Sequence, residues 1–158
     1  MSDAPQSTVA PAGAALGAWL SAEREALEAI LASLIDEQQA LARGGDAMAA
    51  LPDALRRKQS AAETLRALDA ALPARLGVAA DGLPAAFKRA LDADPGLAAQ
   101  WSEVSALAAR ARAENDGNGR LVTTRLHYNR AALDALLAGR DGDTPSPVYG
   151  ANGRLVPR

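Results

Sequence analysis

Leucines recur at every seventh position in the first third of the chain: Leu20, Leu27, Leu34 and Leu41. A helical turn of about 3.6 residues brings these side chains onto one face. A strict seven-residue repeat keeps such a face against a partner helix over many turns. The repeat therefore predicts a long helix that packs in a bundle or coiled coil. Further apolar side chains widen its stripe, namely Leu16, Ile30, Leu31 and Ile35.

Composition points to an all-α fold. Apolar residues make up 49% of the 158 residues but aromatic residues only 3%, so the core must be built mainly from alanine and leucine. These two are among the strongest helix formers, whereas β-branched strand formers are scarce. We expect one all-α domain, an antiparallel helical bundle with coiled-coil-like packing, three long helices and one short helix.

Glycine and proline set the expected ends of the first two long helices. The first should begin near Ala14, after a disordered lead of residues 1–13, and end at Gly44-Gly45. The second should begin near Pro52, a residue favoured in the first helical turn. Lys58 interrupts its apolar face, and Pro73 is expected to bend or end it.

The third long helix has the clearest start signal. After a short helix over 83–92, Asp94-Pro95 combines an N-cap acid with a first-turn proline. The segment 116–119 resembles a turn, but the periodicity runs through it, so we favour one long, locally weakened helix and keep a break as the alternative. A 4-3 spacing follows Asp94 and, after one extra residue, continues to Leu136: Leu97, Trp101, Val104, Ala108, Ala111, Asn115, Asn118, Val122, Leu126, Asn129, Leu133 and Leu136.

Beyond Gly139 the composition changes to glycine, aspartate and proline. Two closely spaced prolines, Pro145 and Pro147, disfavour a helix there. The expected organisation is a lead over 1–13, a helical domain over 14–139 and a flexible tail over 140–158.

Several functional classes are disfavoured by what the chain lacks. The net charge of −2 argues against nucleic-acid binding, and the absence of cysteine excludes disulfides and thiolate metal sites. The first 15 residues do not read as a signal peptide, and no apolar run suggests insertion into a membrane. With His127 as the single histidine, we expect no metal site, no cofactor, no catalytic residue and no enzyme activity.

The most specific pattern runs from Trp101 to the end of the chain. It comprises Asn115-x-x-Asn118-Gly119, then Arg125-x-x-x-Asn129, and finally Tyr149-Gly150-Ala151-Asn152-Gly153. With the upstream leucine pattern, this arrangement resembles the FlgN family of flagellar export chaperones over about residues 16–154. One departure is Asn152, where family members commonly carry an aspartate, so a role for a negative charge there is in doubt.

The resemblance implies a cytoplasmic chaperone that covers the self-associating ends of hook-associated proteins, FlgK-like and FlgL-like clients, until export. It also implies that Tyr149, with Gly150, docks onto the cytoplasmic domain of an FlhA-like export gate. Clients would be received by the C-terminal helical region, where the candidate contact residues are Leu121, Val122, Leu126, Asn129, Leu133 and Leu136.

Asn115, Asn118 and Gly119 are candidate seam or hinge residues, and two interpretations of them stay open. Buried asparagine on an apolar seam can fix register and pairing at some cost in stability. Alternatively, the half-helix after Gly119 is loosely docked and offers its leucines to a client helix. Rival functions are a coiled-coil protein that pairs with itself and a chaperone for another secretion substrate. A monomer is expected, with weak self-association as the open alternative.

Overall fold

The structure is a computed structural model that describes residues 9–142, and the side chains of residues 12–138. Its helices are α1 (Val9–Arg43), α2 (Leu51–Leu76), α3 (Leu83–Ala93) and α4 (Pro95–Gly142). Short 3₁₀ turns, Gly45–Ala50 and Ala80–Gly82, flank α2. No strand occurs in the range described, so the predicted all-α fold with three long helices and one short helix is confirmed. The chain divides between Leu121 and Val122 into two compact units.

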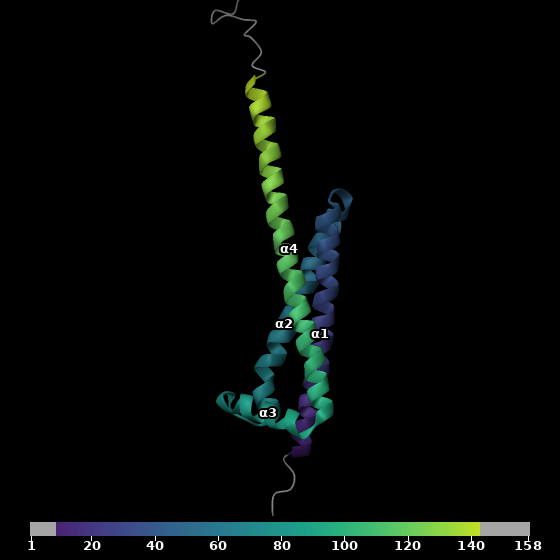
Figure 1. Ribbon diagram of the computed structural model, residues 1–158, viewed down its shortest axis with the longest axis vertical. Coiled ribbons are helices and arrows are strands. Elements are labelled where there is room, and N and C mark those ends of the chain that lie inside the picture. The colour runs from purple at the N-terminus through teal and green to yellow at the C-terminus, as the bar shows by residue number, and fades with distance from the viewer. Residues whose placement is uncertain (1–8, 143–158) are drawn as a thin grey trace, which may run out of the picture. The chain divides into compact units, whose positions relative to one another are not determined.

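Within the first unit the long helices alternate in direction. α1 and α2 are antiparallel and are bridged by Arg57 to Asp36 and by Lys58 to Glu37. α3 turns the chain, and the part of α4 up to Leu121 runs in the same direction as α1 (Figure 1). This up-down-up order is the one that short connections impose on neighbouring helices.

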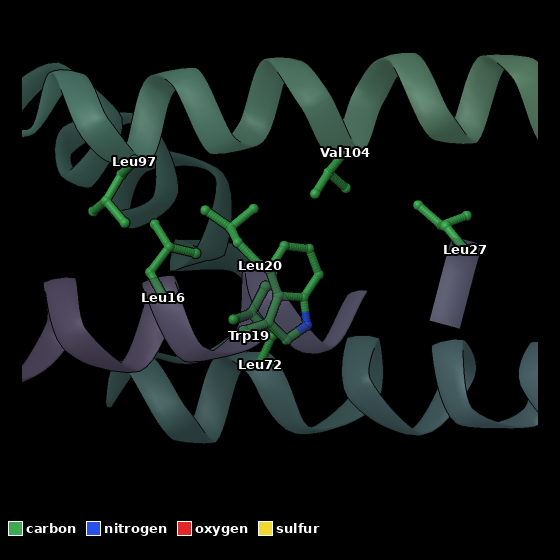
Figure 2. Packing of buried hydrophobic residues seen from close by; sticks show 7 residues of the cluster. All are labelled: Leu16, Trp19, Leu20, Leu27, Leu72, Leu97 and Val104. Carbon is green, nitrogen blue, oxygen red and sulfur yellow. The ribbon is translucent and has the colours of Figure 1, made fainter. Parts of the chain in front are cut away.

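The core of the first unit lies where α1, α2 and α4 meet. Leu16 and Leu20 of α1 face Leu97 and Val104 of α4, and Leu72 of α2 closes the cluster (Figure 2). The predicted leucine repeat is buried along its whole length: Leu20, Leu27, Leu34 and Leu41. α4 matches it with its own seven-residue repeat of buried side chains: Leu97, Val104, Ala111 and Asn118.

The helix ends follow the predicted glycine and proline signals. α1 ends at Gly44, where φ is +65° and the amide donates to the Ala40 oxygen at 3.0 Å. α2 ends in a Schellman motif, with Gly77 left-handed and the Val78 amide bonded to the Pro73 oxygen. At the start of α4 the Asp94 carboxylate accepts the Gly96 amide at 2.8 Å, which confirms the predicted N-cap.

Three boundaries differ from, or refine, the sequence expectation. α1 begins at Val9 rather than near Ala14. Pro11 is compatible with this earlier start, because it lies in the first turn, where amides have no intrahelical partner. α2 continues past Pro73 for three residues, to Leu76. α4 is one helix through 116–119, as favoured, and extends to Gly142.

Candidate functional site

Asn118 forms a buried polar junction that joins α4 to α1 and, through Glu37, to α2. Its side chain is 2% exposed, and its Nδ2 donates to the Leu34 main-chain oxygen at 2.8 Å and to Glu37 Oε2 at 3.2 Å. Glu37, itself buried, also accepts a bond from Lys58 Nζ at 2.7 Å. Asn118 Oδ1 is buried without a partner among the described residues, so the register of α4 against α1 is favoured by the two bonds of Nδ2 alone.

The other predicted seam and hinge residues are placed differently. Asn115 and Asn129 are exposed, so Asn118 is the one asparagine of the three that the structure buries. Gly119 is exposed and lies within the continuous helix, with open space where a Cβ would stand. The structure therefore contains a register contact at Asn118 and no helix break at 116–119.

The candidate client-contact residues beyond Leu121 form an exposed apolar face on α4. Leu126, Leu133 and Leu136 are 53%, 57% and 68% exposed, and Val122 is also exposed. At 100° per residue, Val122, Leu126, Leu133 and Leu136 fall within an arc of about 80°, and Asn129 lies inside that arc. We call the four apolar residues, Val122, Leu126, Leu133 and Leu136, the apolar face of α4. Leu121 is half-buried and points about 100° away from Val122, so it lies off that face.

Two exposed apolar side chains on this part of α4 were missed by the sequence analysis. Leu137 is 57% exposed and stands four residues after Leu133, a spacing that identifies it as a neighbour on the same side of the helix. Tyr128 is exposed as well but points to the other side, because it is six residues from Val122. The i+4 rule would have found Leu137 from the sequence.

A groove opens between α2 and α4 in the first unit, with α1 as its floor. It has a volume of about 700 Å³. We call it the α2–α4 groove, and its apolar lining includes Leu27, Ile30, Leu34, Leu65, Ala108 and Ala111. Small side chains on the α4 side leave this space between two helices that each contact α1.

Charged side chains line the same groove. Glu23 on α1 and Asp69 on α2 lie toward one end, and Lys58 on α2 lies toward the other. Glu23 Oε2 is buried and has no hydrogen-bond partner among the described residues. Burial, together with the negative charge of Asp69, raises the pKa of Glu23 to about 7.

Trp101 packs at the border of the core rather than inside it. Its ring meets the ring of Phe87 edge-on at 5.0 Å between centroids, and Phe87 meets Trp19 at 6.0 Å. Trp19 is buried, whereas Trp101 is 37% exposed. Trp101 belongs to the predicted 4-3 stripe of the third long helix, and the structure places it at the edge of the aromatic row that holds α3 between α1 and α4.

Neither a metal cluster nor a membrane-spanning helix is found in the region described. Among those residues no group of three or more His, Cys, Asp or Glu side chains is placed to hold a metal ion. None of the helices there combines the length and the apolar character needed to cross a membrane. The predicted gate-docking residues, Tyr149 and Gly150, lie outside the described residues.

In a comparison with protein families, the chain matches the FlgN protein family over residues 14–157. The chain belongs to the FlgN family. Comparisons with curated proteins and with solved structures found no match. The match includes the described bundle from Ala14 onward and most of the tail, slightly more than the 16–154 over which the resemblance was predicted.

FlgN proteins are flagellar export chaperones, so membership gives the chain a general role in flagellum assembly and protein export. The family implies binding of flagellar hook-associated client proteins, and it is a chaperone family rather than a family of enzymes. The helical bundle is the scaffold on which this FlgN-family chain carries the Asn118 junction, the apolar face of α4 and the α2–α4 groove.

Proposed function

We propose that this FlgN-family chain is a cytoplasmic chaperone that binds a terminal helix of FlgK-like and FlgL-like hook-associated proteins through the apolar face of α4. The supporting observation is the exposure of Leu126, Leu133 and Leu136 on one side of a regular helix. An amphipathic helix that lays its apolar side on such a face is held by anchors at i, i+3, i+4 and i+7. Val122, Leu126, Leu133 and Leu136 follow one another at intervals of four, seven and three residues, which are the spacings of such a face.

Binding through this face requires no nucleotide or cofactor. Full burial of a leucine side chain contributes about 1.5–3 kcal/mol, so three half-exposed leucines offer several kcal/mol before the cost of association. Such a surplus is compatible with reversible binding, which a chaperone needs because its client must leave at the export gate. The client's own apolar side would be covered by the same contacts, which prevents premature self-association.

Delivery to the gate is assigned to the tail. By family resemblance, Tyr149 and Gly150 dock onto the cytoplasmic domain of an FlhA-like gate protein. Client and gate would then contact different parts of the chain, so that a loaded chaperone remains able to dock.

Calorimetry with a synthetic C-terminal helix of a FlgK-like protein tests the client site. Leu126→Asp with Leu133→Asp places two charges on the apolar face and should weaken binding at least tenfold. Thr124→Asp with Ala131→Asp is the matched control, because these exposed residues lie about 180–200° from Val122 on the same helix. Equal affinity of the two double variants would reject the apolar face as the client site.

Self-association is a second candidate, favoured by the same exposed leucines at 4-3 spacing. Light scattering separates the two functions. A monomer that forms a complex with the client peptide supports the chaperone function. A stable homo-oligomer that does not bind the peptide supports the function of a self-associating coiled-coil protein.

A further inference from the structure

The α2–α4 groove is an incomplete part of the bundle. α1 contacts both neighbours, but between Leu65 of α2 and Ala108 of α4 the space is not filled by side chains. Its volume, about 700 Å³, falls in the range of about 300–1,000 Å³ that is typical of ligand pockets. Along α1 the groove runs from Glu23 to Leu34, about 17 Å or three helical turns. A helix about 10 Å across would occupy roughly twice this volume over three turns, so the length suits one helix that is partly sunk between α2 and α4.

The apolar lining of the groove indicates that a helix bound there would present an apolar face to it. Leu27, Ile30 and Leu34 rise from α1, and alanines on α4 allow close approach of another backbone. A helix with leucine-like side chains on one face would complete a four-helix arrangement, packing as the existing helices do.

The charged side chains of the groove indicate one further property of the helix that would bind there. Glu23 Oε2 is buried in the groove wall without a partner, and Asp69 adds a second carboxylate from α2. An ionised carboxylate only accepts hydrogen bonds, so its partner must be a donor. Trp19 Nε1, four residues earlier on α1, is also buried without a partner among the described residues, but it is neutral, whereas a cation would also offset the charges of Glu23 and Asp69. The cations that line the groove do not fill this role: Lys58 is bonded to Glu37, and Arg112 makes no ion pair with Glu23 in the described part of the chain. Asp116, on α4, adds a third carboxylate.

We infer that the α2–α4 groove binds an amphipathic client helix that carries a lysine or arginine on its apolar face, placed opposite Glu23 and Asp69. This inference rests on the proposed function for the identity of the occupant as a client. It adds a second contact surface, in the first unit, and a selection rule based on charge. A basic side chain would satisfy the buried oxygen, whereas a glutamate at the same place would be repelled by two carboxylates.

Proton linkage gives the inference a distinctive signature. Glu23, with a pKa near 7, must be ionised to attract the cation, and binding of the cation favours the ionised form. Affinity for a basic peptide should therefore rise with pH, by up to about tenfold between pH 6 and pH 8, as the ionised fraction rises from about 0.1 to 0.9. The other charged groups that face the groove are Asp69, Lys58, Arg112 and Asp116.

Fluorescence anisotropy with designed peptides tests the rule. The probes are leucine–alanine helices of about 18 residues, long enough to span the groove, that differ in one central residue of the apolar face: lysine, glutamine or glutamate. The wild-type chain should bind the lysine peptide at least tenfold more tightly than the glutamate peptide at pH 8. Equal binding of the three peptides would overturn the inference.

Variants separate this site from the apolar face of α4. Glu23→Gln with Asp69→Asn should reduce the lysine preference to within about twofold and remove its pH dependence, whereas Glu25→Gln, an exposed carboxylate outside the groove, should keep both. Retention of the preference in the first variant would overturn the inference. Leu126→Asp with Leu133→Asp should keep the preference, and its loss there would instead place the lysine contact on the apolar face. Circular dichroism confirms that each variant is folded. A lysine preference that persists while FlgK-like and FlgL-like peptides fail to bind would support the groove and reject the proposed clients.

Discussion

Asn118 Nδ2 donates a hydrogen bond to the main-chain oxygen of Leu34 across 2.8 Å, so the last buried position of the α4 repeat is bonded to the backbone of the α1 repeat. Leu34 is also buried, and each of the two residues belongs to the buried seven-residue repeat of its own helix. A carbonyl in mid-helix already accepts its intrahelical bond, but it has a second lone pair that Asn118 uses. This pairing sets how far α4 is shifted along α1.

Replacing Asn118 tests the contribution of this junction to stability. Asn118→Ala removes two hydrogen bonds, one of them to Glu37, which keeps its bond from Lys58, so we expect a loss of about 1–3 kcal/mol in the free energy of unfolding. Asn115→Ala, three residues earlier and exposed, should change it by about 0.5 kcal/mol or less. Urea denaturation followed by circular dichroism measures both. Similar losses in the two variants would show that Asn118 is not a special contact.

Gly117 offers a test of helix continuity through 116–119. Its φ is not in the left-handed region, and a Cβ there would meet nothing within 4 Å. Gly117→Ala should therefore raise stability by up to about 1 kcal/mol, because glycine loses more backbone entropy in a helix. Gly77→Ala is the contrasting control: at φ +66° it should cost about 1–2 kcal/mol. Thermal melting that showed destabilisation by Gly117→Ala would argue for a break in the helix.

The sequence predicted the elements well where a local signal existed. The leucine repeat, the glycines after Arg43 and the Asp94-Pro95 start each act within a few residues, and each is present as expected. Periodicity also carried more weight than the turn-like composition of 116–119, because packing of Ala111 and Asn118 on α1 favours the helical state there.

The features that the sequence could not predict depend on partners far along the chain. Asn115 and Asn118 occupy equivalent positions in the apolar spacing of the sequence. Asn118 differs because it bonds to the Leu34 carbonyl and the Glu37 carboxylate, more than 80 residues away. The raised pKa of Glu23 likewise depends on burial in the folded chain and on the charge of Asp69 from another helix. The groove results from the spacing of three helices, which no short segment encodes.

The pH dependence of stability should carry the signature of Glu23. Its pKa is raised from 4.5 to about 7 in the folded chain, so the folded state binds the proton more tightly than the unfolded state. Its favourable contribution is complete below pH 4.5 and is lost as the pH rises through about 7. Glu23→Gln should therefore melt at a higher temperature than the wild type at pH 8, with a smaller difference near pH 5. An equal difference at both pH values would contradict this assignment.

Tyr149 should separate delivery from client binding. Tyr149→Ala is expected to leave the affinity for a FlgK-like peptide unchanged while it abolishes measurable binding to the cytoplasmic domain of an FlhA-like protein. Surface plasmon resonance with each partner measures the two affinities, and Val148→Ala serves as the neighbouring control. Unchanged gate binding after Tyr149→Ala would remove the tail from the proposed delivery step.

Hydrogen–deuterium exchange of the chain with and without a saturating FlgK-like terminal peptide tests the central claim most directly. The apolar face of α4 is proposed to receive the client, so amides of residues 122–138 should exchange at least about tenfold more slowly in the complex, because a docked client suppresses local opening of that helix. A complex that forms while exchange in 122–138 stays unchanged would contradict the account.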